Sequence, residues 1–124
     1  MRKSFVYHKL QVWNLAKDLV IEVYKLTKGF PAEEKYGLAS QINRAVISIA
    51  SNIAEGSGRT GRKDQAHFTQ VAYGSLMEVA CQAEISCDLG FVTDSELDAV
   101  YTKNGTLAEK LSALRSSQLK MMQN

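Results

Sequence analysis

Carboxylates and histidines are the residues most able to do chemistry here, because in helical proteins they build metal sites and acid–base pairs. A di-iron bundle needs Glu-x-x-His on facing helices, and none of the eight glutamates has a histidine three residues later. Asp64 and His67 have this spacing but stand alone. The glycines of Gly56-x-Gly58-x-x-Gly61 follow a predicted helix rather than the strand that a dinucleotide-binding loop requires. The sequence therefore predicts no catalytic residue, no metal site and no cofactor.

Arg62 and His67 leave one catalytic alternative open. Their spacing resembles the arginine-x4–6-histidine signature of a class of helical ribonucleases, whose arginine and histidine act at a dimer cleft. Arg2 and His8 satisfy the same loose spacing, which shows how readily it arises by chance. We expect a protein that is not an enzyme. A ribonuclease that uses Arg62 and His67 is one alternative, and a purely structural protein-interaction module is another.

Two middle segments carry a polar stripe beside an apolar one, at the steps of three and four residues that place side chains on one helix face. The predicted polar network consists of Gln41, Arg44, Ser48, Asn52, Glu55, Ser75 and Glu78. In a hairpin that turns near residue 60, Arg44 lies opposite Glu78. Ser48 then lies opposite Ala72. We expect a largely buried Arg44–Glu78 ion pair that specifies register more than it adds stability. The alternative is that both stripes are solvated faces.

The first predicted helix is apolar over about half of its circumference, which is more than a bundle core requires. Either Trp13 and its neighbours reach two adjoining helices, or part of this face meets another subunit. Our candidate residues for an oligomer interface are Trp13, Val12 and Leu19.

Glycines, a proline and capping residues divide the chain into four expected helices, at about 8–28, 33–56, 62–89 and 94–120. Thr93 and Glu96 have the spacing of a capping box at the start of the last one. Asn104-Gly105 leaves open whether that helix is continuous. Short connections between long helices force antiparallel neighbours. We therefore predict an all-α protein, a single domain over 1–124 folded as an up-down-up-down antiparallel four-helix bundle.

Composition agrees with a globular protein of the cytoplasm. The 124 residues are 45% hydrophobic and 23% charged, which is ordinary for a soluble domain. No apolar run approaches the roughly 18 residues that a membrane span needs, and no export signal region follows the basic N-terminus. Cys81 and Cys87 lie six residues apart, on different sides of a helix, which favours reduced thiols.

Charge is unevenly distributed in the predicted bundle, although the formal net charge is only +2. The N-terminus, the second loop and the C-terminus share one end, which we call the basic pole. It collects eight cations against two carboxylates, Glu55 and Asp64. The cations are Arg2, Lys3, Lys9, Arg59, Arg62, Lys63, Arg115 and Lys120. Phosphate backbones respond to such a positive field regardless of sequence. The alternative is that mobile ends carry lysine and arginine for solubility.

Several blocks of residues occur in the order found in one known family. They are Gln11–Ala16, Phe30-Pro31, Tyr36–Leu38, Gln41–Ala45, Ser48-Ile49, Asn52–Gly56, Ala72–Ser75 and Glu78. The chain resembles the small four-helix-bundle proteins encoded in intervening sequences of bacterial large-subunit ribosomal RNA genes. It is more distantly similar to the accessory variability determinant of diversity-generating retroelements, a pentameric bundle that binds a reverse transcriptase and nucleic acid.

The resemblance implies a ring-forming homo-oligomer, a pentamer, that binds RNA or DNA and leaves room for a protein partner. Joined to the charge distribution, it predicts that nucleic acid contacts Arg59, Arg62 and Lys63, assisted by Arg2, Lys3 and Lys9. No membrane partner is expected.

Overall fold

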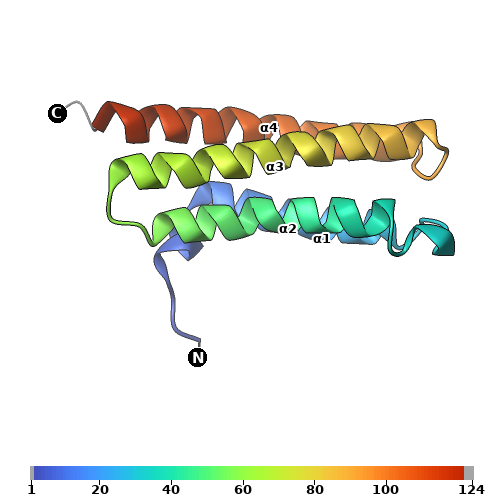
Figure 1. Cartoon of the computed structure of the whole chain (residues 1–124), viewed down its shortest axis with the longest axis horizontal. Coiled ribbons are helices and arrows are strands. Elements are labelled where there is room, and N and C mark those ends of the chain that lie inside the picture. The colour runs from blue at the N-terminus through green and yellow to red at the C-terminus, as the bar shows by residue number, and fades with distance from the viewer. Residues whose placement is uncertain (1, 122–124) are drawn as a thin grey trace.

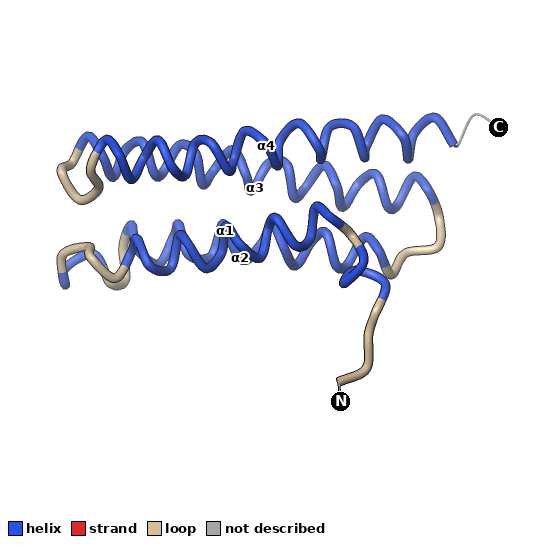
Figure 2. The backbone as a smooth tube through the Cα atoms, turned by 180° about the vertical axis from the view of Figure 1, so that it is seen from behind, coloured by secondary structure: helices blue, strands red, loops and turns tan. Residues whose placement is uncertain are grey.

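The protein is an all-helical bundle in the computed structural model, which describes residues 2–121. The helices are α1 (Gln11–Thr27), α2 (Leu38–Ser57), α3 (Arg62–Asp88) and α4 (Asp94–Lys120), with two 3₁₀ turns, η1 (Val6–Lys9) and η2 (Ala32–Glu34). Neighbours in sequence run antiparallel, α1 and α2 forming one layer and α3 and α4 the other (Figures 1 and 2). No strand occurs in the described residues. The predicted all-α four-helix bundle is confirmed.

Two helices begin later than the sequence indicated. The first begins at residue 11 rather than 8, because Val6–Lys9 forms a separate 3₁₀ turn and Leu10 is extended, with φ −85° and ψ 123°. The second begins at 38 rather than 33. Glu34 lies in a 3₁₀ turn, and its Oε1 accepts a hydrogen bond from the Leu38 amide at 3.1 Å. Glu34 thus caps the start of α2 from outside the helix.

The core fills the space between the two layers. Its largest fully buried side chains are Leu19, Ile42, Ile49, Leu76, Leu107 and Leu111, with Val23, Val46, Val79 and Val100. Val12 is 7% exposed and Leu19 is 0% exposed, so both pack inside their own chain. Their assignment to an oligomer interface was wrong. Periodicity identified them as apolar, but it could not tell which half of a wide apolar face pointed inward.

Helix α4 is continuous through Asn104-Gly105. Asn104 is buried, and its Nδ2 donates to the Leu76 carbonyl oxygen of α3 at 3.3 Å, so this polar residue joins two helices instead of interrupting one. At the start of α4 the predicted capping box is confirmed. Thr93 Oγ1 accepts from the Glu96 amide at 3.1 Å, and Glu96 Oε1 accepts from the Thr93 amide at 2.9 Å.

Helices α2 and α3 approach each other closely through small residues. Ala45 and Ala72 are buried between them, and the Ser48 and Ser75 hydroxyl oxygens lie 2.8 Å apart. Ser48 therefore lies opposite Ser75 and not opposite Ala72, a shift of about one helical turn. Near the loop, a Cβ on Gly56 would lie 3.0 Å from Phe68 Cβ, so only glycine fits there without displacing the aromatic residue.

Candidate nucleic-acid interface

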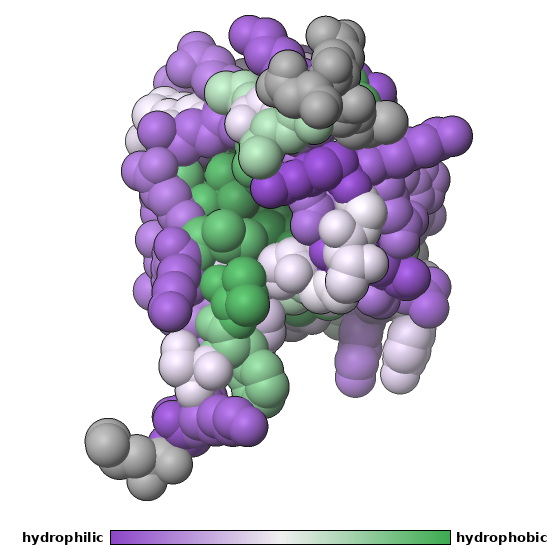
Figure 3. Space-filling model, turned by 90° about the vertical axis from the view of Figure 1, so that its left-hand side faces the viewer, coloured by the Kyte–Doolittle hydropathy of each residue, from purple (hydrophilic) through white to green (hydrophobic). Residues whose placement is uncertain are grey.

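One end of the bundle brings together the N-terminal arm (residues 2–5), the α2–α3 loop and the last turns of α4 (Figure 1). These segments, together with η1 and the first turn of α3, carry the cations of the basic pole. Figure 3 looks onto this end and shows hydrophilic residues around a hydrophobic strip that runs toward the arm. In the described residues no helix is both long and apolar enough to cross a membrane.

Arg59 is the least available cation of the basic pole. Its guanidinium nitrogens lie 3.3 Å from Glu55 Oε2 and 3.6 Å from Asp64 Oδ2. The same group covers the Phe68 ring, with its central carbon 4.7 Å from the ring centroid. Two carboxylates therefore balance the charge of Arg59, and its side chain ties the α2–α3 loop to both flanking helices. Glu55 belongs to this cluster rather than to the network of Ser48 and Asn52.

Arg62 and Lys63 are exposed on the first turn of α3, after Gly61. Arg62 Nη1 donates to Gln65 Oε1 at 3.2 Å, and the described residues show no ion pair for either cation. The arm with Arg2 and Lys3 projects from the body (Figures 1 and 2), and Lys9 is exposed in η1. All six residues predicted to contact nucleic acid thus lie at one end of the bundle. In the described part of the chain, five of the six form no ion pair with a carboxylate, and Arg59 is the exception.

Arg62 and His67 do not converge on one point. Five residues of α-helix separate them, which turns their side chains about 140° apart around the axis. His67 is exposed and lies edge-on to Phe68, with ring centroids 5.4 Å apart. His8 of the matching Arg2–His8 pair is engaged locally, since its Nδ1 accepts from the Phe5 amide at 2.9 Å. Within one chain, Arg62 and His67 therefore point to different sides of α3.

The predicted polar network forms only in part. Asn52 Nδ2 donates to Ser48 Oγ at 3.0 Å, and Ser48 in turn meets Ser75. Arg44 and Glu78 are both exposed, and no ion pair joins them in the residues that the structure describes, so the buried pair was wrong. They line an open groove of about 260 Å³ together with Gln41 and Gln82. The small residues let the helices close beneath these long side chains, which leaves the charges in solvent.

Trp13, the remaining interface candidate, is half-buried on α1. Tyr7 and His8 of η1 pack against its ring at centroid distances of 4.7 and 5.5 Å. The exposed apolar surface of the first two helices lies elsewhere, at Ile21 and Tyr24 of α1 and Ile47 of α2. We call these three residues the α1–α2 patch. They line a groove of about 300 Å³ with Val20, Lys25 and Lys28.

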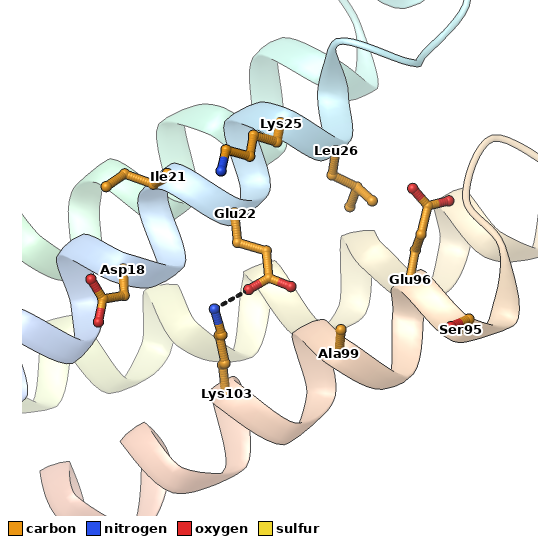
Figure 4. A pocket seen from close by; sticks show the side chains of 9 residues that line it. All are labelled: Asp18, Ile21, Glu22, Lys25, Leu26, Ser95, Glu96, Ala99 and Lys103. Atoms are coloured by element: carbon orange, nitrogen blue, oxygen red, sulfur yellow. Dashed lines mark ion pairs between the residues drawn. The ribbon is translucent and has the colours of Figure 1, made fainter.

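A groove of about 590 Å³ lies between α1 and α4 (Figure 4). A Glu22–Lys103 ion pair crosses it, and Asp18, Lys25 and Glu96 point into it from the two helices. Its charges are mixed, and its excess is acidic. No group of three or more histidine, cysteine or acidic side chains in the described part of the chain could hold a metal ion. This groove suits neither a phosphate backbone nor a metal.

Two further ionisable groups are held protonated. Desolvation, followed by a hydrogen bond to Asp94 Oδ1 at 3.3 Å, raises the pKa of the Cys87 thiol. The Tyr101 hydroxyl donates to Glu84 Oε1 at 2.6 Å, which raises the pKa of Tyr101 to about 12. A raised pKa keeps a thiol or a phenol in its protonated form at neutral pH, and the protonated form is the weaker nucleophile.

Comparisons with known proteins concern the family and the fold. The family model described as "23S rRNA-intervening sequence protein" matches residues 8–113. A crystal structure of a protein of unknown function from the S23 ribosomal protein family of Bacteroides thetaiotaomicron has the same fold, with a TM-score of 0.78 and 17% sequence identity. The match covers 84% of this chain and 97% of that one. No curated protein sequence matches the chain.

Proposed function

The chain belongs to the 23S rRNA-intervening sequence protein family, and on that premise we propose that it is a non-enzymatic, ring-forming homo-oligomer that binds RNA or DNA through its basic pole. The observation that carries this proposal is the gathering of the arm, the α2–α3 loop and the end of α4 at one end of the bundle. Seven cations of the basic pole lack the two carboxylate partners that balance the charge of Arg59. They are Arg2, Lys3, Lys9, Arg62, Lys63, Arg115 and Lys120.

Self-association supports the proposal through the field that it would create. The α1–α2 patch exposes 48% of Ile21, 41% of Tyr24 and 42% of Ile47, and adjoining apolar groups of this kind mark interaction surfaces. A ring uses two different patches on each subunit and turns the same end of every subunit to one side. The positive fields of the poles would then add. The resemblance to pentameric relatives supplies the subunit number, five.

The absence of catalysis is also part of the proposal. Arg62 and His67 diverge around α3, and the two groups with raised pKa values make poor nucleophiles. We propose a cytoplasmic location, where RNA is the abundant polyanion. A protein partner would find its complement in the mixed-charge α1–α4 groove of Asp18, Glu22 and Lys103 rather than at the basic pole.

Charge reversal at the pole tests the binding function. For a single strand, each phosphate contact contributes about −0.7 to the slope of log affinity against log salt concentration. At ~0.05 M salt each contact therefore strengthens binding roughly eightfold. The double variant Arg62→Glu, Lys63→Glu should therefore weaken binding of a fluorescein-labelled 20-nucleotide single-stranded RNA by about 60-fold or more. Fluorescence anisotropy measures the affinity.

The matched control is Lys35→Glu, Lys110→Glu, which makes the same change in net charge away from the basic pole. It should weaken binding less than about threefold, because only the general field changes. Equal losses in the two variants would mean that net charge, and not the pole, governs binding. Loss of RNA cleavage in His67→Ala would instead support the ribonuclease alternative.

A further inference from the structure

A second polar groove opens at the basic pole, between the first turns of α3 and the last turns of α4. We call it the Arg115 groove. It encloses about 310 Å³ and is lined by Thr69, Gln70, Tyr73, Leu111, Ser112, Arg115 and Ser116. One cation and several hydroxyl groups line it, and no carboxylate does. Its volume is at the lower end of the roughly 300–1,000 Å³ of small-ligand sites, which suits one nucleotide unit rather than a duplex.

Arg115 differs from Arg59 in what surrounds it. Arg59 lies between Glu55 and Asp64, whereas Arg115 is exposed and forms no ion pair within the described residues. A guanidinium group presents its donors as a planar fork that matches two phosphate oxygens. Because no acidic side chain lines the groove, a phosphate entering it would meet no competing carboxylate.

The serines of α4 share the face of Arg115. Ser112 and Ser116 are four residues apart, and Ser112 precedes Arg115 by three, so the three side chains lie along one helix face. Both serines are exposed, and the described residues contain no hydrogen bond from either hydroxyl. Thr69 is different, because its Oγ1 lies 2.8 Å from Gln118 Oε1 and 3.1 Å from the Gln65 carbonyl oxygen. Thr69 thus forms the floor, and the serines are the free donors and acceptors.

We propose that the Arg115 groove binds one phosphate and its adjoining ribose of an RNA strand. Arg115 pairs with the phosphate oxygens, and Ser112 and Ser116 bond the 2′-hydroxyl group. This assignment rests on the proposed nucleic-acid binding function and narrows it from RNA or DNA to RNA, because the 2′-hydroxyl is the group by which a protein separates the two.

A variant that changes no charge tests the groove without altering the electrostatic field of the basic pole. Ser112→Ala, Ser116→Ala changes no charge and places a better helix former on an exposed face, so the fold is preserved. It should weaken binding of the single-stranded RNA about five- to tenfold, as expected for a lost hydrogen bond or two. Binding of the same sequence as DNA should be unchanged, so the preference for RNA disappears.

Arg115→Lys is the companion variant, since it keeps the charge but loses the planar fork. It should weaken RNA binding several-fold while the salt dependence stays the same. Unchanged RNA affinity in Arg115→Lys would mean that the planar fork contacts no phosphate, and it would overturn the role given to Arg115.

Unchanged RNA affinity in the double serine variant would also overturn the groove assignment. The proposed function would still stand if Arg62→Glu, Lys63→Glu abolished binding in the same assay. Absence of any RNA binding by the wild-type protein would remove the proposed function and the groove assignment together.

Discussion

Replacing Leu19 with alanine should lower the free energy of unfolding by about 2–5 kcal/mol. Leu19 is 0% exposed and packs in the centre of the bundle, so the truncation removes buried methyl groups and leaves a cavity. The matched control is Ile85→Ala on α3, where the side chain is 44% exposed and lies outside the α1–α2 patch. That change should cost less than about 1 kcal/mol. Urea unfolding followed by circular dichroism, at one protein concentration, measures both values.

Leu19 and Ile21, on the same helix, distinguish the core from the proposed subunit interface. Wild-type protein at micromolar concentration should scatter light with a mass several times 13.7 kDa. Ile21→Asp, which places a charge in the α1–α2 patch, should reduce that mass, whereas folded Leu19→Ala should keep it. A wild-type monomer would remove the ring. Dissociation by Leu19→Ala with an unaltered free energy of unfolding would restore Leu19 to the interface.

Raising the salt concentration from ~50 to ~200 mM should weaken RNA binding about 100-fold. The warrant is counterion release, in which each neutralised phosphate of a single strand contributes roughly −0.7 to the slope of log affinity against log salt. Contact with about five phosphates, fewer than the seven available cations of the basic pole, gives a slope near −3.5. Anisotropy titrations at four salt concentrations measure it.

Arg62→Glu, Lys63→Glu should reduce the magnitude of this slope by about 1.4, the share of two phosphate contacts. Arg59→Gln should change it much less, because Glu55 and Asp64 already balance the charge of Arg59. A slope near zero in the wild type would mean that RNA is held by stacking or by base contacts, and the basic pole would lose its role.

The architecture was predictable because the signals for it are local. The capping box of Thr93 and Glu96 marks the start of α4 through two hydrogen bonds within one turn. The start of α2 was misplaced because Glu34 suits a helix N-terminus electrostatically, whether it lies in the helix or, as here, in the turn before it. Charge preference locates the helix end only to within a turn.

The side-chain pairings were less predictable because they depend on helix rotation and register. A register shift of one turn separates the expected Ser48–Ala72 neighbours from the observed Ser48–Ser75 contact. The polar stripe showed which face Arg44 and Glu78 occupy, but not that small residues bring the helices together beneath them. Arg59 is a similar case, since its nearness to Asp64 depends on the geometry of the α2–α3 loop.

The Arg115 groove had a weak signal in the sequence. Ser112, Arg115 and Ser116 have the spacing of one helix face, and Arg115 was already counted with the basic pole. The partners from α3, Gln70 and Tyr73, could be added only once the register of α3 against α4 was known. A site whose residues come from two helices cannot be assembled from the sequence without that register, whereas a site within one loop can.

Where the RNA lies on the bundle is the most direct test of the central claim. A single-stranded RNA that carries 4-thiouridine would be cross-linked to the wild-type protein by light at ~50 mM salt, and the modified peptides identified by mass spectrometry. The proposed function predicts cross-links concentrated in the N-terminal arm, in residues 57–70 and in residues 112–120. Cross-links concentrated at the opposite end, in residues 28–37 and 89–98, or no cross-linked protein at all, would contradict it.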